Sequence, residues 1–155
     1  MAANTAPIFT KIGDVQWTTA AMTVANNTYN LATGTAYLAF SADSTNGGFV
    51  QRIRFKAGGA NNASATVCRV FINNGGATGT TSNNILWDEI SLPTTTASAT
   101  AALAVYELPM NIALPAGYAI YCVVATAPNT GGWYATVIGG KYRSEEQTSE
   151  LQSLA

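Results

Sequence analysis

Short apolar runs of strand length recur along the chain, and clusters of Gly, Asn, Thr and Pro separate them. Runs of this length, without helical spacing, predict β-strands. Before residue 143 almost nothing favours a helix. The strands that we expect cover residues 8–17, 35–42, 49–56, 65–72, 85–92, 105–112, 118–127 and 133–138.

About eight evenly spaced strands are typical of an all-β protein built as an antiparallel sandwich or barrel. Eight strands with a crossover favour a jelly-roll-like antiparallel β-sandwich, in which residues 94–102 would cross between the sheets. An immunoglobulin-like sandwich remains the alternative, although the spacing of Cys68, Trp87 and Cys122 fits that family poorly. We also predict hairpin loops at residues 75–79 and 128–132, where turn-forming residues gather.

The predicted strand at residues 49–56 alternates most clearly, so one of its faces lies on a core and the other on water or a partner. Arg52, Arg54 and Lys56 share a face with Val50 and form a basic stripe, spaced by about 6.6–6.8 Å. The stripe is either a solvated, edge-protecting face or a contact for acidic side chains of a partner subunit. The opposite face would hold Phe49, Gln51, Ile53 and Phe55.

Aromatic residues are the other candidate for binding. Core packing is the simplest interpretation of Trp17, Trp87 and Trp133, and stacking on sugars or anchoring an interface is the alternative. Trp133 and Tyr134 are neighbours on one predicted strand, so we expect Trp133 in the core and Tyr134 at the surface. The candidate interface therefore comprises Arg52, Arg54, Lys56 and Tyr134.

Composition changes the picture of the surface. Only 10% of the 155 residues are charged, against about 25% in an ordinary soluble domain. A surface of small neutral side chains costs little to dehydrate, which suits a protein covered by neighbours, although a stable monomer with a neutral surface is the alternative. The net charge of −1 offers no field for nucleic acid, and no stretch approaches a membrane span or a secretory signal. We therefore expect neither nucleic acid nor a membrane as a partner.

Candidate chemistry is sparse. The chain has no histidine, so the usual general base near neutral pH and every Ser-His-Asp arrangement are missing. Cys68 and Cys122 lie in apolar runs and are expected as buried thiols, pairing only if their strands face each other. Asp88 and Glu89 point to opposite faces, and nothing places Glu107 beside either for glycoside hydrolysis. We expect no enzyme, no catalytic or metal site and no cofactor.

The composition shifts after Tyr142. Residues 143–153 contain no Gly and no aromatic residue, and they are similar to RSEEHTSELQS, the translation of a common sequencing adapter, with Gln147 in place of His. We expect residues 1–142 to form the single domain and residues 143–155 to be a non-native or disordered polar tail from assembled environmental sequence. Without that tail the chain has six basic and five acidic residues, a net charge of +1.

Several stretches carry a resemblance to a family of small tailed-bacteriophage proteins from phage structural gene modules. They are the opening MAANTAPIF, RVFINNG at residues 69–75, and a close that runs from ELP at residue 107 through LPAGY and GW to VIGGKY at residue 142. The resemblance implies a virion-associated, β-rich protein without catalytic residues, although Lys141 stands where the family commonly has an acid. We expect a homo-oligomer, with a trimer favoured, that decorates a capsid in the virion and contacts the major capsid protein or other virion proteins. The alternative is a binding module of the tail, baseplate or fibre, with glycans as its candidate ligands.

Overall fold

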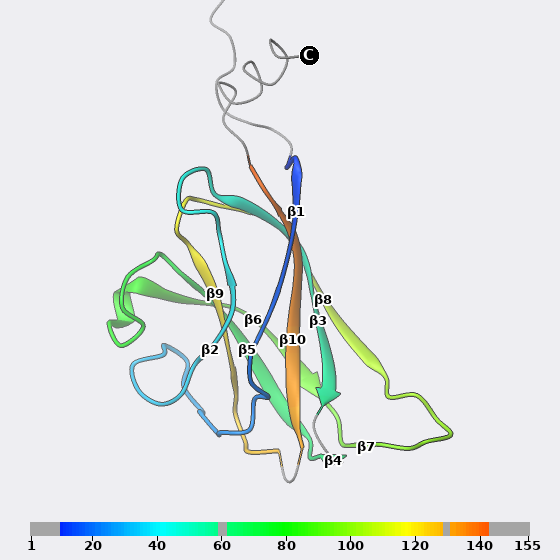
Figure 1. Cartoon of the computed structure of the whole chain (residues 1–155). Coiled ribbons are helices and arrows are strands. Elements are labelled where there is room, and N and C mark those ends of the chain that lie inside the picture. Colours follow the sequence, from blue (N-terminus) through cyan, green and yellow to red (C-terminus); the bar gives the residue numbers. More distant parts are fainter. Residues whose placement is uncertain (1–9, 59–61, 129–130, 143–155) are drawn as a thin grey trace, which may run out of the picture.

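The computed structural model describes residues 10–58, 62–128 and 131–142. Two four-stranded antiparallel sheets pack against each other, with strand orders β1-β10-β3-β8 and β2-β9-β5-β6 (Figure 1). The helical structure in these ranges is a single short 3₁₀ turn (η1, Thr81–Asn83). No helix in them is long and apolar enough to cross a membrane. The strands are β1 (Ile12–Trp17), β2 (Tyr37–Ser41), β3 (Gly48–Gly58), β4 (Asn62–Ala63), β5 (Thr66–Asn73), β6 (Asn84–Leu92), β7 (Thr95–Thr96), β8 (Val105–Leu114), β9 (Ala119–Val124) and β10 (Gly132–Lys141).

The strands of the two sheets pair in a nested order. The first strand pairs with the last (β1 with β10), the second with the last but one (β2 with β9), then β3 with β8 and β5 with β6. The chain is thus one long hairpin, and the pairings of β10 with β3 and of β9 with β5 fold it into two sheets. This connectivity is a jelly roll, as predicted. An immunoglobulin-like sandwich pairs its strands in another order, so that alternative does not describe this chain.

All eight predicted strands are present, within a few residues of their expected bounds. Two connections behave as expected, because residues 74–83 close the β5–β6 hairpin and residues 93–104 cross from one sheet to the other. The hairpin predicted at residues 128–132 is wrong, since β9 and β10 belong to different sheets and the connection between them crosses the sandwich. The prediction for residues 143–155 lies outside the described residues.

The core lies between the two sheets and contains large aromatic and aliphatic side chains. Trp133 is fully buried there, as predicted, and its ring meets Tyr106 edge-on with the centroids 5.9 Å apart. Burying a side chain of this size contributes about 2–3 kcal/mol relative to leaving it in water. Other fully buried side chains of this core are Phe40, Phe55, Met22, Ile53, Leu92 and Ile120.

A bulge at Gln51 overturns part of the predicted alternation in β3. The register with both neighbouring strands skips this residue, so Val50 faces the core while Phe49 is only half-buried. One extra residue in a strand exchanges its two faces beyond that point. Arg52, Arg54 and Lys56 keep their shared outward face, but Val50 does not belong to it.

The prediction that all three tryptophans pack in the core is wrong for two of them. Trp17 is 56% exposed and Trp87 is 45% exposed. Both lie on edge strands, β1 and β6, which have a neighbour on one side only. Trp87 is the extra residue of a second bulge, where β5 pairs Val70 with Asp88 and Phe71 with Leu86.

The segment between β1 and β2 covers the outer face of the second sheet. Leu31 is buried there against Phe71 and Val123, in a small cluster separate from the main core. Asn26 of the same segment is buried and donates to the carbonyl groups of Thr33 and Thr35. This sheet therefore has apolar residues on both faces, and the covering segment supplies the second apolar layer.

Arg69 of β5 links this segment to the sheet through hydrogen bonds, an ion pair and a contact with an aromatic ring. Its side chain is only 6% exposed, and its Nε donates to Glu89 Oε1 on β6 at 2.7 Å. One terminal nitrogen donates to Asn27 Oδ1 at 2.6 Å, the other donates to the Tyr29 hydroxyl at 2.7 Å, and the guanidinium carbon lies 3.8 Å from the Tyr29 ring centroid. A buried cation is tolerated here because the carboxylate and neutral acceptors satisfy its donors.

Cys68 and Cys122 are fully buried free thiols, as predicted. They lie on the neighbouring strands β5 and β9, offset by two residues in the register. A hydrogen bond with Cys122 and burial together raise the pKa of Cys68 well above the ordinary thiol range.

We expect neither thiol to react with DTNB in the folded protein near pH 8, close to the ordinary thiol pKa, and both to react on unfolding in guanidinium. Because the folded pKa of Cys68 is raised, its effect on stability is complete below the ordinary thiol pKa and fades as pH rises above it. The free energy of unfolding should therefore fall at alkaline pH. Rapid labelling of the native protein would contradict the burial of both thiols.

Replacing Arg69 by Met should lower the free energy of unfolding by about 2 kcal/mol, since it removes charge-assisted hydrogen bonds that hold the covering segment. The matched control is Arg52→Met, which removes a partly exposed guanidinium and should cost less than about 1 kcal/mol. Urea unfolding followed by far-UV circular dichroism measures both values. Equal effects of the two substitutions would show that the contacts of Arg69 do not stabilise the fold.

Candidate interaction surface

Three rows of side chains cross the outward side of the first sheet, and we call them the outer face. The first row passes from β8 to β10 through Val105, Lys56 and Tyr134. The other two rows also reach β1 and are defined by direct pairing of residues on neighbouring strands. They contain Glu107, Arg54, Thr136 and Trp17, and then Pro109, Arg52, Ile138 and Val15.

Basic residues occupy the β3 column of the outer face. Glu107 forms ion pairs with both arginines, with Arg54 Nε 3.2 Å from Oε1 and an Arg52 terminal nitrogen 3.6 Å from Oε2. All three side chains are partly exposed, so each ion pair stabilises the fold by less than about 1 kcal/mol. Lys56 lies between the uncharged Val105 and Tyr134. The outer face therefore presents three cations and one carboxylate.

Apolar residues occupy the opposite side of the outer face. Trp17 and Val15 of β1 are 56% and 52% exposed, and Ile138 of β10 pairs with Val15. Trp17 also borders a hollow of about 310 Å³ between β1 and β2, which Tyr37 and the exposed Leu38 line as well. Large exposed apolar side chains in one patch are typical of interaction sites on soluble proteins.

The ring of Tyr134 lies across the neighbouring strand, over Gly58. A Cβ atom added at Gly58 would collide with Cδ2 and Cε2 of that ring. An aromatic ring that covers a glycine on the adjacent strand compensates for the missing side chain and adds a cross-strand contact. Tyr134 is therefore a half-buried residue with a defined orientation on the outer face.

The four predicted interface residues, Arg52, Arg54, Lys56 and Tyr134, lie together on this face, in neighbouring columns on β3 and β10. Whether they contact a partner stays a prediction. Val15 and Glu107 share the face but were missed by sequence reasoning, and Trp17, which also shares it, was named only as an alternative interface anchor.

The alternation of polar and apolar residues in β1 did not reveal which face of this strand points to solvent. Polar residues normally face water, yet Asp14 is buried and Gln16 turns toward the second sheet. Gln16 Nε2 donates to the Ser41 carbonyl and Ser41 N donates to Gln16 Oε1, both at 2.9 Å. Its side-chain amide thus replaces a backbone pairing between the two sheets. Val15 and Trp17 alternate with these residues, so they point outward.

The acidic residues do not form a catalytic pair. Glu107 is paired with the arginines of the outer face, whereas Glu89 is paired with Arg69 under the segment that covers the other sheet. These two carboxylates therefore lie on opposite sides of the sandwich. In the ranges that the structure describes, no three Asp, Glu or Cys side chains are grouped to hold a metal ion.

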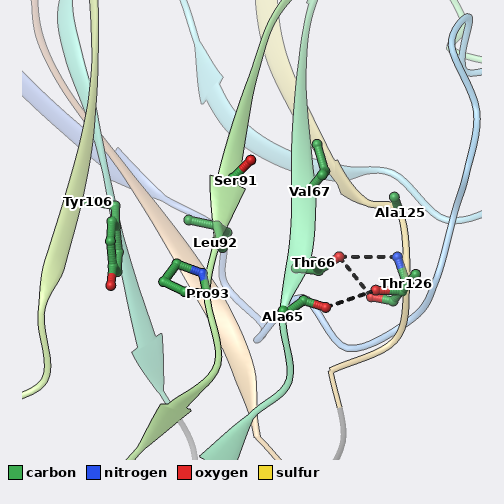
Figure 2. Close-up of a pocket in the computed structure, with 9 residues that line it drawn as sticks. All are labelled: Ala65, Thr66, Val67, Ser91, Leu92, Pro93, Tyr106, Ala125 and Thr126. Carbon is green, nitrogen blue, oxygen red and sulfur yellow. Dashed lines mark hydrogen bonds between the residues drawn. The ribbon is translucent and has the colours of Figure 1, made fainter.

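A groove of about 670 Å³ lies where β6 ends and where β5 and β8 begin (Figure 2). Its threonine hydroxyls are engaged within the protein, since Thr66 Oγ1 donates to the carbonyl of Thr126 and Thr126 Oγ1 donates to that of Ala65. None of its lining residues is charged, so the groove offers an apolar surface with little polar recognition. The lining residues are Ala65, Thr66, Val67, Ser91, Leu92, Pro93, Tyr106, Ala125 and Thr126.

No protein-family model matches this chain, and a search of curated proteins finds no match. The arguments for function therefore rest on the residues of the chain itself, and the outer face is the best-defined candidate.

We expect Gly58→Val to lower the free energy of unfolding by about 1–3 kcal/mol, because the new side chain must displace the Tyr134 ring. Gly13→Val is the matched control, since Gly13 is also a strand glycine and nothing lies within 4 Å of a Cβ built there. Adding Tyr134→Ala to Gly58→Val should make the cost smaller than the sum of the two single costs. Additive costs in urea unfolding would show that the ring does not lie over Gly58.

Proposed function

We propose that this protein is a structural component of a tailed-phage virion, and most simply a capsid decoration protein acting through protein–protein contacts. The observation that carries the proposal is the outer face, where Trp17 and Tyr134 lie beside Arg52 and Arg54. Trp, Tyr and Arg are the residue types that contribute most to binding at protein interfaces.

The role in a virion is supported by the resemblance of residues 1–142 to tailed-phage proteins. The jelly roll agrees with it, since this fold is common in viral capsid domains, but lectins and cupins share the fold and it assigns no role alone. The low charge of the chain adds support, because neutral surfaces are cheap to dehydrate when subunits cover one another.

We propose a homo-oligomer, with a trimer favoured, whose partner in the particle is the major capsid protein or another virion protein. The sandwich has four edge strands, β1, β8, β2 and β6, each with a neighbouring strand on one side only. An oligomer or a shell covers such edges and the exposed apolar residues beside them.

A binding module of the tail, baseplate or fibre is the second candidate. Trp17 pairs directly with Thr136, so Tyr134 is its diagonal neighbour on the adjacent strand. Two aromatic rings on neighbouring strands, Trp17 exposed and Tyr134 half-buried, are suited to stacking on sugar rings. This arrangement favours glycans as the ligand if the protein belongs to the tail.

Purified protein mixed with undecorated capsids should bind saturably, and Trp17→Ala should weaken binding by about tenfold or more. Val24→Ala is the control, because Val24 is exposed to a similar extent but lies in the segment that covers the other sheet. Co-sedimentation with capsids measures both. Absence of saturable binding together with retention of glycans on an array would replace the decoration role by the tail role.

A further inference from the structure

The chain carries a second charged surface, opposite in sign to the basic stripe. Asp88 and Glu89 are neighbours on the edge strand β6, and although they point to opposite faces of the sheet, both border its free edge. Glu89 is 43% exposed while the side chain of its partner Arg69 is only 6% exposed, so the carboxylate reaches the surface and the guanidinium stays beneath it. We call β6 from Ile85 to Glu89 the acidic edge.

Exposed apolar side chains accompany the charge on both surfaces. Ile85 and Trp87 are 62% and 45% exposed on the acidic edge, as Val15 and Trp17 are on the outer face. Trp87 protrudes because it is the extra residue of the β6 bulge. Each surface thus combines a tryptophan, an aliphatic residue and charges of one dominant sign, which is the composition of a protein interface rather than of a solvated strand.

The two surfaces point in different directions on one molecule. The basic stripe faces outward from the first sheet, whereas β6 is the free edge of the second sheet. Leu92 of β6 and Tyr106 of β8 line the same groove, so the acidic edge lies on the flank of the sandwich next to β8. One copy cannot bring its own two surfaces together, but two copies can.

We infer that the acidic edge of one copy docks on the outer face of the next, so that this protein assembles head to tail. Lys56, which lies between uncharged neighbours, and the arginines would meet Asp88 and Glu89 of the adjacent copy. Because the contact joins two different surfaces it is heterologous, and successive copies close into a ring when the rotation from one copy to the next divides a full turn. The inference deepens the proposed function, since it names the partner of the outer face as a second copy of this chain.

Charge reversal tests the inference on the full chain, by sedimentation velocity and native mass spectrometry. The wild type should form a ring oligomer that weakens as salt rises. Lys56→Glu and Asp88→Lys should each raise the dissociation constant by about tenfold or more, because each places like charges opposite one another. Lys141→Glu is the matched control on β10, seven residues or roughly 23 Å from the Tyr134 position that pairs with Lys56, and should leave the oligomer unchanged.

Mixing the two charge-reversed variants shows whether a loss of the oligomer comes from the reversed charges or from misfolding. The reversed charge at position 56 of one variant then meets the reversed charge at position 88 of the other, and the two native charges meet in the next contact. Equal amounts should therefore reassociate into alternating rings with an even number of copies. The double variant Lys56→Glu with Asp88→Lys should also reassociate alone. Failure of the mixture to reassociate overturns the inference, and so does tighter association of Lys56→Glu, which would mean that the stripe meets itself.

Capsid binding separates this inference from the proposed function. A wild-type chain that is monomeric but binds undecorated capsids overturns head-to-tail assembly and leaves the decoration role standing. A ring that depends on Lys56 and Asp88 but binds no capsid supports the assembly and overturns the decoration role.

Discussion

The nested pairing of strands is the constraint on which the rest of this structure depends. Each strand of the first half of the chain has its partner in the second half, with the β5–β6 turn at the centre. Asn73 and Asn84 hold this turn, since Asn73 Nδ2 donates to Asn84 Oδ1 at 2.7 Å and Gly75 N donates to Asn73 Oδ1. Gly75 has a φ of 93°, which glycine adopts without strain. A slip of one residue here would move every apolar side chain of the inner pair to the wrong face, so the turn determines the register from which the outer pairs continue.

Bulges then decide which side chains reach the surface. The extra residue Gln51 allows Val50 to enter the core while Arg52, Arg54 and Lys56 remain outside. The extra residue Trp87 does the same on β6, where Leu86 turns toward Phe71. Met110 and Asn111 of β8 stand opposite Gln51, between the pairs Arg52–Pro109 and Val50–Ile112. Asn111 has a φ of 51°, a conformation that asparagine tolerates better than most residues. The two charged surfaces of the protein are therefore consequences of local breaks in the alternation of the strands.

The alternation of the sequence predicted the class of fold and the position of every main strand, because period-two patterning and turn residues are local signals. It did not predict which strands pair. Residues 128–132 look like a hairpin loop, yet the nested order sends β9 and β10 to different sheets. Nor did it predict the covering segment, since the contacts of Leu31 with Phe71 and Val123 join residues far apart in the chain. At the candidate site, the shared face of Arg52, Arg54 and Lys56 was predictable, whereas the exposure of Trp17 depends on Gln16 bonding across the sandwich to Ser41.

Because the chain has few charged side chains, their positions determine which of its surfaces can attract one another. Among the described residues, three of the six basic side chains stand in one column of β3, and two of the five acidic ones are adjacent on β6. Surface ion pairs contribute little to the stability of one chain, but across an interface they determine which surfaces meet and in what orientation. The neutral Thr, Ser, Asn and Gly residues that surround them cost little to dehydrate and carry no direction of their own. A surface of this kind is suited to assembly, because contact energy can come from Trp17 and Trp87 while the charges select the partner.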